Sequence, residues 1–285
     1  MIQSVRQYIV AEEEGGTWFA TWRKSPTQTT VAGIWYDLGM ATGNPAPNYY
    51  AATPLRSKAL SRSQDGGLDH GPDCAPGTKY LKEFCALGTA GVPITFLLCD
   101  YLLYYPFVDM DNAEVIQVDA LPRYADGVGV QIAAVQVFSQ SGAGSPKFQV
   151  QYTNSDGVAG RLTDVVSCNT LTIPGNLITS HAVAPAGYNH AASPFLPLQR
   201  GDLGVRSIQG VIWQTPDVGL LALVLAVPIE MTLIRDITAP VERSCLADFG
   251  KMPRIQDDAF LNILCCPSGS ISGAQFHGYL RTIFG

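Results

Sequence analysis

The feature that most constrains this chain is its texture after residue 112. Short apolar runs alternate there with clusters of glycine, proline, asparagine and aspartate. Runs of this kind are typical of strands, and the breakers between them are typical of hairpin turns. The sequence therefore predicts a mainly β protein, an antiparallel β-sandwich that is jelly-roll-like. The expected strands are 129–138, 147–154, 161–170, 204–214, 219–234 and 259–266.

The N-terminal part is predicted to be mixed α/β. Residues 1–14 favour a short helix, but the three glutamates at its C-terminal end oppose the helix dipole, so a strand over 6–13 remains an alternative. Segments 17–24 and 29–39 are rich in β-forming residues. Two stretches lack regular patterns, a proline-containing extended connection over 41–54 and a loop over 61–78.

Two further helices are expected before residue 112. Leu81, Phe84 and Cys85 have helical spacing within 78–88, and Gly88 provides a stop. The apolar run 93–106 is long enough for a buried helix that Pro106 ends.

These patterns divide the chain into three parts. We expect a mixed N-terminal region over 1–111, the sandwich over 112–240 and a C-terminal extension over 241–285. The polar stretch 178–194 is predicted to be an extended arm, because loops of this length are usually functional contacts.

Composition restricts the partners. Only 15% of the residues are charged and the net charge is −6, so the broad basic field of a nucleic-acid-binding protein is absent. No apolar run reaches the length of a membrane span. Low charge beside 9% aromatic residues indicates a surface that other subunits cover.

The cysteines indicate a reducing environment. Their number, 7, is odd, and their spacing fits neither a disulfide framework nor a zinc site. Since the first residues do not form a secretory signal, we expect synthesis in a reducing cytoplasm with free thiols.

No motif predicts catalysis, and we expect no enzyme activity, cofactor, metal or small-molecule substrate. Asp69, His70, Asp73 and Cys74 combine acid, imidazole and thiol, but a glycine-rich turn alone does not hold such groups in place. The acidic residues from 109 to 114 lack the glycine and terminal glutamate of a calcium loop. A pair of catalytic carboxylates among the many acids cannot be selected from sequence, so a glycan hydrolase stays an alternative.

Interface residues are predicted from residue type and position. Most tryptophans are expected in the core, whereas Tyr49 and Tyr50 in the proline-rich connection should contact a neighbouring element or subunit. Arginines beside a Gly-Asp turn more often form loop hydrogen bonds or interface pairs than nucleic-acid contacts. The candidate interface residues are Tyr49, Tyr50, His181, Tyr188, His190, Arg200 and Arg206.

Several segments together resemble virion proteins encoded by tailed bacteriophages. They are WYDLGMATGNPAPNYYAATPL, DYLLYYPFVDMD, LPRYADGVGVQ, QYTNSDGVAGR and PFLPLQRGDLGVRS, and the resemblance covers most of residues 31–235. It implies a structural component of the virion, of the capsid decoration (cement) type, with the major capsid protein and further copies of itself as partners. A role as the main shell protein is less favoured, because no long spine helix is visible. A tail or receptor-binding component is the other structural alternative.

Overall fold

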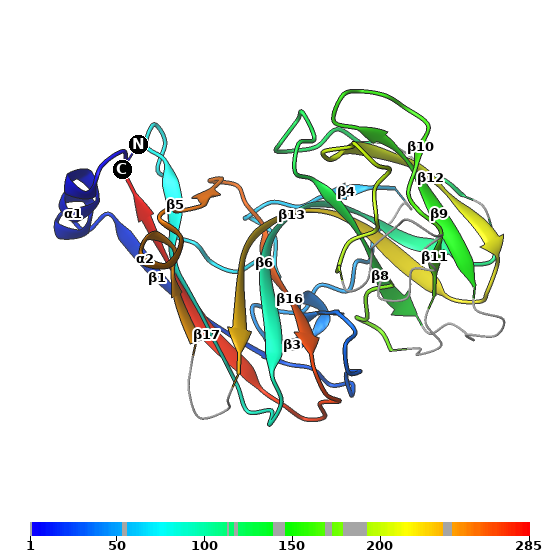
Figure 1. Cartoon of the computed structure of the whole chain (residues 1–285), viewed down its shortest axis with the longest axis horizontal. Coiled ribbons are helices and arrows are strands. Elements are labelled where there is room, and N and C mark those ends of the chain that lie inside the picture. Colours follow the sequence, from blue (N-terminus) through cyan, green and yellow to red (C-terminus); the bar gives the residue numbers. More distant parts are fainter. Residues whose placement is uncertain are drawn as a thin grey trace.

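The fold is mainly β. The computed structural model describes residues 2–52, 56–112, 114–116, 119–138, 146–168, 173–178, 193–235 and 241–285. Strands account for 47% and helices for 7% of the structure, which confirms the predicted fold class. All strand pairs between the named strands are antiparallel. Figure 1 shows the strands distributed over two lobes.

The strands in the described part of the chain form three sheets. Sheet A has the order β14–β5–β17–β1–β3, with β15 also pairing with β5. Its strands are β1 (Thr17–Ser25), β3 (Thr42–Asn44), β5 (Lys79–Gly88), β14 (Val241–Ser244), β15 (Arg254–Ile255) and β17 (Phe276–Phe284). Sheet B has the order β2–β16–β6–β13–β8, with β4 also pairing with β6. Its strands are β2 (Tyr36–Asp37), β4 (Lys58–Ala59), β6 (Ile94–Asp109), β8 (Gln131–Phe138), β13 (Leu220–Ile234) and β16 (Leu261–Pro267).

Sheet C completes the second lobe. Its order is β10–β9–β12–β7, and β11 also pairs with β9. Its strands are β7 (Glu114–Val115), β9 (Lys147–Asn154), β10 (Arg161–Leu162), β11 (Val166–Ser167) and β12 (Val205–Thr215). Every run after residue 112 that the sequence predicts as β therefore contains at least one strand.

Sheet B contributes residues to the hydrophobic cores of both lobes. One core cluster joins Trp22 and Phe84 of sheet A to Phe96 of β6. A second cluster joins Phe148 and Tyr152 of sheet C to other residues of β6, β8 and β13. Because β6 and β13 are 16 and 15 residues long, they extend from one sandwich into the other. The molecule is therefore two sandwiches built on one continuous sheet.

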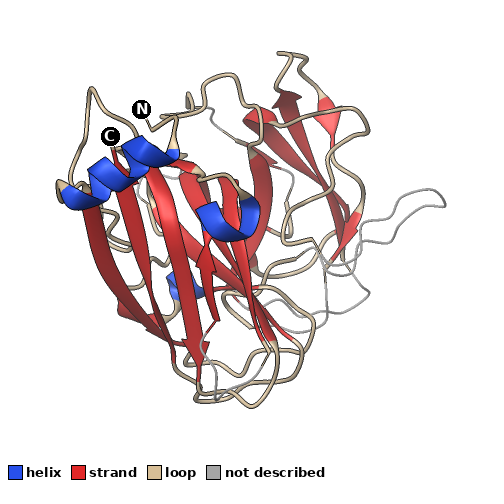
Figure 2. Ribbon diagram, turned by 60° about the vertical axis from the view of Figure 1, so that its left-hand side comes forward, coloured by secondary structure: helices blue, strands red, loops and turns tan. Residues whose placement is uncertain are grey.

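Within the described residues, three short helical elements accompany the sheets. They are α1 (Val5–Glu13), the 3-10 helix η1 (Leu38–Met40) and α2 (Cys245–Phe249). The predicted N-terminal helix is confirmed, and the Ser4 hydroxyl caps it by accepting a hydrogen bond from the Gln7 amide at 3.2 Å. Figure 2 shows α1 lying across one end of sheet A. Within the described part of the chain, no helix has the length and apolar character needed to cross a bilayer.

The helix predicted over 78–88 is wrong, because this segment is strand β5. Thr282 pairs with Leu81 and Arg281 pairs with Glu83, so Lys82 is an extra residue in β5, a β-bulge. The bulge turns Leu81 and Phe84 to the same buried side although they are three residues apart. Because of this bulge, the buried residues Leu81 and Phe84 have the three-residue spacing that is typical of a helix.

The helix predicted over 93–106 is also wrong, because this segment lies in strand β6. Both faces of β6 are covered along most of its length, so its sequence is a continuous apolar run without alternation. Pro106 does not end the strand. It lies beside Phe107, which has a φ of 52°, at a register shift against β13, and a bulge of this kind tolerates a residue without an N–H group.

The C-terminal segment is part of the central sheets. β17 lies between β5 and β1 in sheet A, and β16 lies between β2 and β6 in sheet B. Residues 241–285 thus pair with strands from the first 111 residues. The domain boundaries predicted at 111/112 and 240/241 stay a prediction.

We expect Gly278→Ala to lower the free energy of unfolding by about 1–3 kcal/mol, the usual effect of overpacking. A Cβ at Gly278 would lie 1.9 Å from the Cys85 carbonyl oxygen of the neighbouring strand, and backbone cannot move aside locally. Denaturant unfolding measures the loss. Gly91→Ala is the matched control, because a Cβ there meets nothing within 4 Å. Equal losses in the two variants would contradict this account of the close approach.

Candidate interaction surfaces

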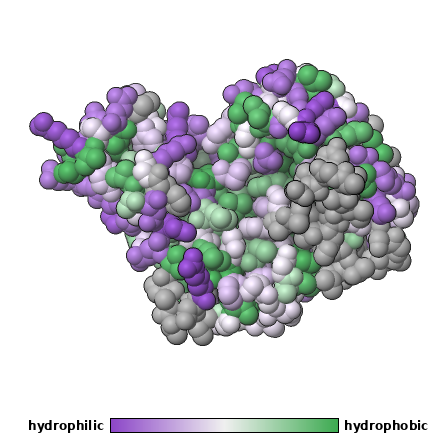
Figure 3. All heavy atoms as spheres, viewed as in Figure 1, coloured by the Kyte–Doolittle hydropathy of each residue, from purple (hydrophilic) through white to green (hydrophobic). Residues whose placement is uncertain are grey.

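Exposed apolar side chains gather at the α1 end of the molecule. Val5, Ile9 and Val10 of α1 are 66%, 49% and 40% exposed, and Phe19 of β1 is 56% exposed. We call these four residues the helix surface. Single exposed apolar residues are ordinary, but several of them gathered at one end of a molecule indicate a contact site. Figure 3 shows apolar atoms at this end of the molecule.

The opposite side of α1 attaches it to sheet A. Ala11 is buried, and Glu12 forms an ion pair of 2.5 Å with Lys82 of β5. The Lys82 ammonium also lies 5.7 Å from the centre of the Tyr8 ring. Arg281 of β17 adds a longer ion pair of 3.9 Å to Glu12. These cations offset the unfavourable position of Glu12 near the helix C-terminus.

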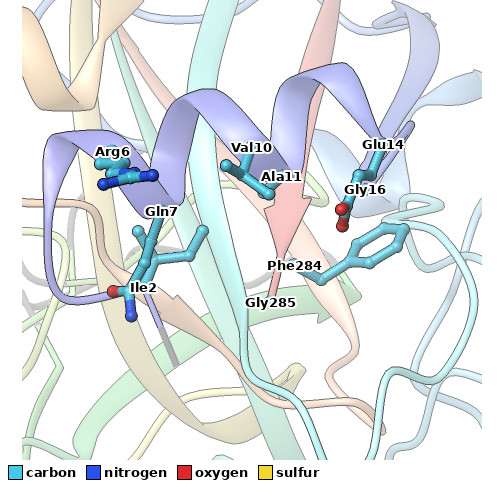
Figure 4. Close-up of a pocket in the computed structure, with 9 residues that line it drawn as sticks. All are labelled: Ile2, Arg6, Gln7, Val10, Ala11, Glu14, Gly16, Phe284 and Gly285. Atoms are coloured by element: carbon cyan, nitrogen blue, oxygen red, sulfur yellow. The ribbon is translucent and has the colours of Figure 1, made fainter.

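A cavity of about 460 Å³ lies between α1 and the end of β17. In Figure 4, Val10 of α1, Glu14 just after the helix and Phe284 of β17 surround the same space. A second cavity, of about 310 Å³, lies on the other side of α1 beside Val5 and Tyr8. The helix is therefore a ridge with an open hollow on each side.

A second group of exposed apolar side chains lies on the other lobe. Val128, Val158 and Leu203 are 49%, 51% and 68% exposed and come from three different loops. We call them the loop surface. Backbone contacts bring the loops together. The Gly129 amide donates to the Leu203 carbonyl at 3.0 Å, and the Ser155 amide donates to the Gly204 carbonyl at 2.9 Å.

Hydrogen bonds to the Asp202 carboxylate stabilise the loop surface. This carboxylate accepts two hydrogen bonds from the Arg161 guanidinium, both at 2.9 Å. It also accepts hydrogen bonds from the Tyr152 hydroxyl at 2.5 Å and from the Asn154 amide at 2.8 Å. Burial acts to raise the pKa of Asp202, but these hydrogen bonds outweigh burial and lower it. The carboxylate therefore stays charged and fixes the turn that carries Leu203.

The predicted interface residues differ in their exposure and in whether the structure describes them. Tyr49 is 53% exposed, and Arg200 and Arg206 are exposed near the loop surface. Arg206 donates from Nε to the Asp126 carbonyl at 3.0 Å. His181, Tyr188 and His190, with most of the predicted arm, lie outside the described residues. The role of the exposed residues at an interface stays a prediction.

Tyr50 has no exposed surface and contacts other elements of its own chain. Its ring centre lies 5.2 Å from that of Tyr104, and its hydroxyl donates to the buried Asp37 carboxylate. Burial raises the pKa of Asp37, although hydrogen bonds from Tyr50, Asn262 and the Gly39 amide act to lower it. Tyr50 therefore belongs to the core, where it contacts neighbouring elements of its own chain, one of the two kinds of contact predicted for it, and its side chain is not exposed to a partner. Trp22 and Trp35 are core residues as predicted, whereas Trp18 is 41% exposed.

The acid, imidazole and thiol of the 61–78 loop do not converge on one another. Asp69 accepts a hydrogen bond from the Trp18 indole at 3.0 Å, and Asp73 pairs with Arg62 at 2.7 Å. The fully buried His70 instead contacts the Ala259 carbonyl and the Lys79 ammonium, at 2.9 and 3.2 Å. Burial and the nearby Lys79 lower the pKa of His70 to about 4, so the ring is neutral.

Asp257 connects the rest of this buried cluster. Its carboxylate lies 3.3 Å from the Lys79 ammonium and accepts a hydrogen bond from the Cys74 thiol, also at 3.3 Å. Lys79 and Asp257 were missed by sequence reasoning, because Asp257 is nearly two hundred residues from the loop. The contacts attach the loop to the C-terminal segment. Among the described residues, no group of His, Cys, Asp and Glu side chains could hold a metal ion.

The acidic residues from 109 to 114 include a local turn. The Asp109 carboxylate accepts hydrogen bonds from the Asp111 amide and the Asn112 side chain, both at 2.9 Å. These bonds lower the pKa of Asp109. The turn follows strand β6, whereas the sequence pattern had suggested the end of a helix.

Comparison with known proteins gives little. No protein family and no curated protein matches the chain. A chain in the structure of infectious bursal disease virus Gt strain is 6% identical, over 94% of this chain and 81% of its own length, with a TM-score of 0.17. A chain from the Gx strain is 8% identical over 94% and 80%, also with a TM-score of 0.17. A chain of T=1 particles derived from the virus is 8% identical over 94% and 77%, with a TM-score of 0.18. Scores this low carry no argument about the fold or function of this chain.

Proposed function

We propose that this chain is a structural protein of a virion, a decoration protein on the capsid surface of a tailed bacteriophage that bridges neighbouring shell subunits. The observation that carries the proposal is the presence of two apolar surfaces on different lobes. The helix surface lies at one end of the long axis, and the loop surface lies on the other lobe (Figure 1). A protein that bridges neighbours needs contact areas that face different partners.

The two surfaces are individually small. Complete burial of a valine, leucine, isoleucine or phenylalanine side chain contributes about 1.5–3 kcal/mol. Association costs about 4–15 kcal/mol in lost freedom of movement. Three or four side chains that are only about half exposed therefore offset no more than the lower part of this cost. Stable attachment then requires that both surfaces engage at once, so that the second contact forms at a high effective concentration.

Such a protein would stabilise the shell by mass action, because only the assembled shell brings partners for both surfaces within reach. The major capsid protein and further copies of this chain are the proposed partners. The proposal includes no catalytic step, nucleic acid or small-molecule substrate. Immunogold labelling tests its location, since label on tails would favour a tail or receptor-binding role. Release of reducing sugar from host glycans by the purified chain would favour the hydrolase alternative.

We expect particles without this protein to release their DNA at a lower temperature than complete particles. A dye that fluoresces on released DNA measures the transition during heating. Adding back the wild-type chain should restore the higher temperature, whereas Leu203→Ser should restore it only in part, because it removes the most exposed apolar side chain of the loop surface. Val218→Ser is the matched control, since Val218 is 61% exposed in the turn between β12 and β13. Unchanged particle stability without the protein would exclude the decoration role.

A further inference from the structure

The outward face of α1 carries a symmetric pattern. Arg6 and Glu13 are seven residues apart, so they lie on the same side of the helix, about 10 Å apart along its axis. Both are exposed. Ile9 and Val10 lie midway between them and are 49% and 40% exposed. The outward face of α1 therefore has a positively charged end, an apolar centre and a negatively charged end.

The charges of Arg6 and Glu13 both interact unfavourably with the dipole of α1. Arg6 lies in the first turn, where the N-terminal end of the dipole is positive, and Glu13 lies in the last turn, where it is negative. A neighbouring helix that runs antiparallel reverses this relation. It places its negative C-terminal end beside Arg6 and its positive N-terminal end beside Glu13.

We propose that two copies of this chain associate through α1 about a two-fold axis. The axis passes between Ile9 and Val10, so the apolar centres of the two helices pack together. Each Arg6 then faces Glu13 of the other copy. The same charge pair therefore forms twice, as a two-fold interface requires. The cavity beside Val10 provides room for the side chains of the second copy.

The other side chains on this helix are compatible with the arrangement. Val5 lies about 100° around the helix from Arg6, toward the second cavity, and is therefore at the edge of the contact rather than opposite a charged residue of the other copy. Glu12 is already engaged with Lys82 and stays on the side that faces sheet A. No two like charges are brought directly opposite each other in this register.

The inference extends the proposed function. It rests on that function only for the expectation that a second copy is a neighbour on the particle. It assigns the helix surface to contacts between copies and leaves the loop surface for the shell. Its test uses the purified chain without particles, so its failure can be distinguished from failure of the decoration role.

The experiment is sedimentation equilibrium of the full chain at low ionic strength, where screening of exposed charges is weak. The wild-type chain should dimerise reversibly. Arg6→Glu and Glu13→Arg should each weaken dimerisation by about tenfold or more, because each creates two like-charge contacts in a two-fold dimer. The double variant Arg6→Glu with Glu13→Arg restores opposite charges across the axis and should dimerise again.

Lys58→Glu is the matched control, since it reverses an exposed charge on β4, away from α1 (Figure 1), and it should dimerise like the wild type. Circular dichroism verifies that every variant is folded. A wild-type chain that stays monomeric at all concentrations would overturn the inference. So would a double variant as monomeric as the two single variants, because charge pairing across the axis would then have no role.

Discussion

Arg123→Met is expected to lower the free energy of unfolding by about 3–5 kcal/mol, the usual effect of leaving a buried charge without its partner. Arg123 donates to both carboxylate oxygens of Asp100, from Nε at 3.0 Å and from Nη2 at 2.7 Å. The two side chains are only 7% and 1% exposed. Burial raises the pKa of Asp100, and the guanidinium acts against this rise. Without Arg123, either a charge or an added proton must be accommodated inside the protein.

The same arginine also connects three segments of backbone. It donates to the carbonyl oxygens of Leu60 and Tyr101, at 2.9 and 3.0 Å, while Asp100 accepts from the Phe260 amide at 3.0 Å. Denaturant unfolding at neutral pH measures the loss. Arg281→Met is the control, because the pair that Arg281 forms with Glu83 is partly exposed and such pairs contribute about 0–1 kcal/mol. Equal losses for the two variants would show that burial of the Arg123 pair has no special effect.

Acidification is expected to remove about 3 kcal/mol of stability through His70 alone. Its pKa falls from 6.5, its ordinary value, to about 4 in the folded protein, and each unit corresponds to about 1.4 kcal/mol. Between these values the unfolded chain binds a proton that the folded chain does not bind, so stability rises with pH. The contribution is complete above pH 6.5 and is lost as the pH falls to about 4.

Unfolding free energies measured from pH 7 to pH 4 in wild type and His70→Gln isolate this effect from that of the carboxylates. Glutamine can still donate to the Ala259 carbonyl and accept from Lys79, but it does not titrate. The variant should therefore lose less stability than the wild type over this interval. His277→Gln on β17 is the control for removing an imidazole elsewhere. Parallel pH profiles for wild type and His70→Gln would contradict the burial of a neutral ring.

The candidate surfaces were only partly visible in the sequence. Low charge and abundant aromatic residues predicted a covered surface, and the arginines of the Gly-Asp turn lie near one of the two surfaces. Val5 and Ile9 have helical spacing, but spacing does not tell which side of a helix faces the protein. Val128, Val158 and Leu203 lie in three separate loops, which the pairing of β9 with β12 and an isolated bridge between Val128 and Gly204 bring together.

The sequence by itself determined the class of fold, because turn residues between short apolar runs permit little except antiparallel strands. It also determined the N-terminal helix, whose cap is local. The tertiary structure alone decided the conformation of β5 and β6, where a bulge and two-sided burial hide the alternation of a strand. It likewise decided that the C-terminal residues lie at the centre of two sheets. Pairing between strands far apart in the chain depends on hydrogen bonds and packing that no local pattern records.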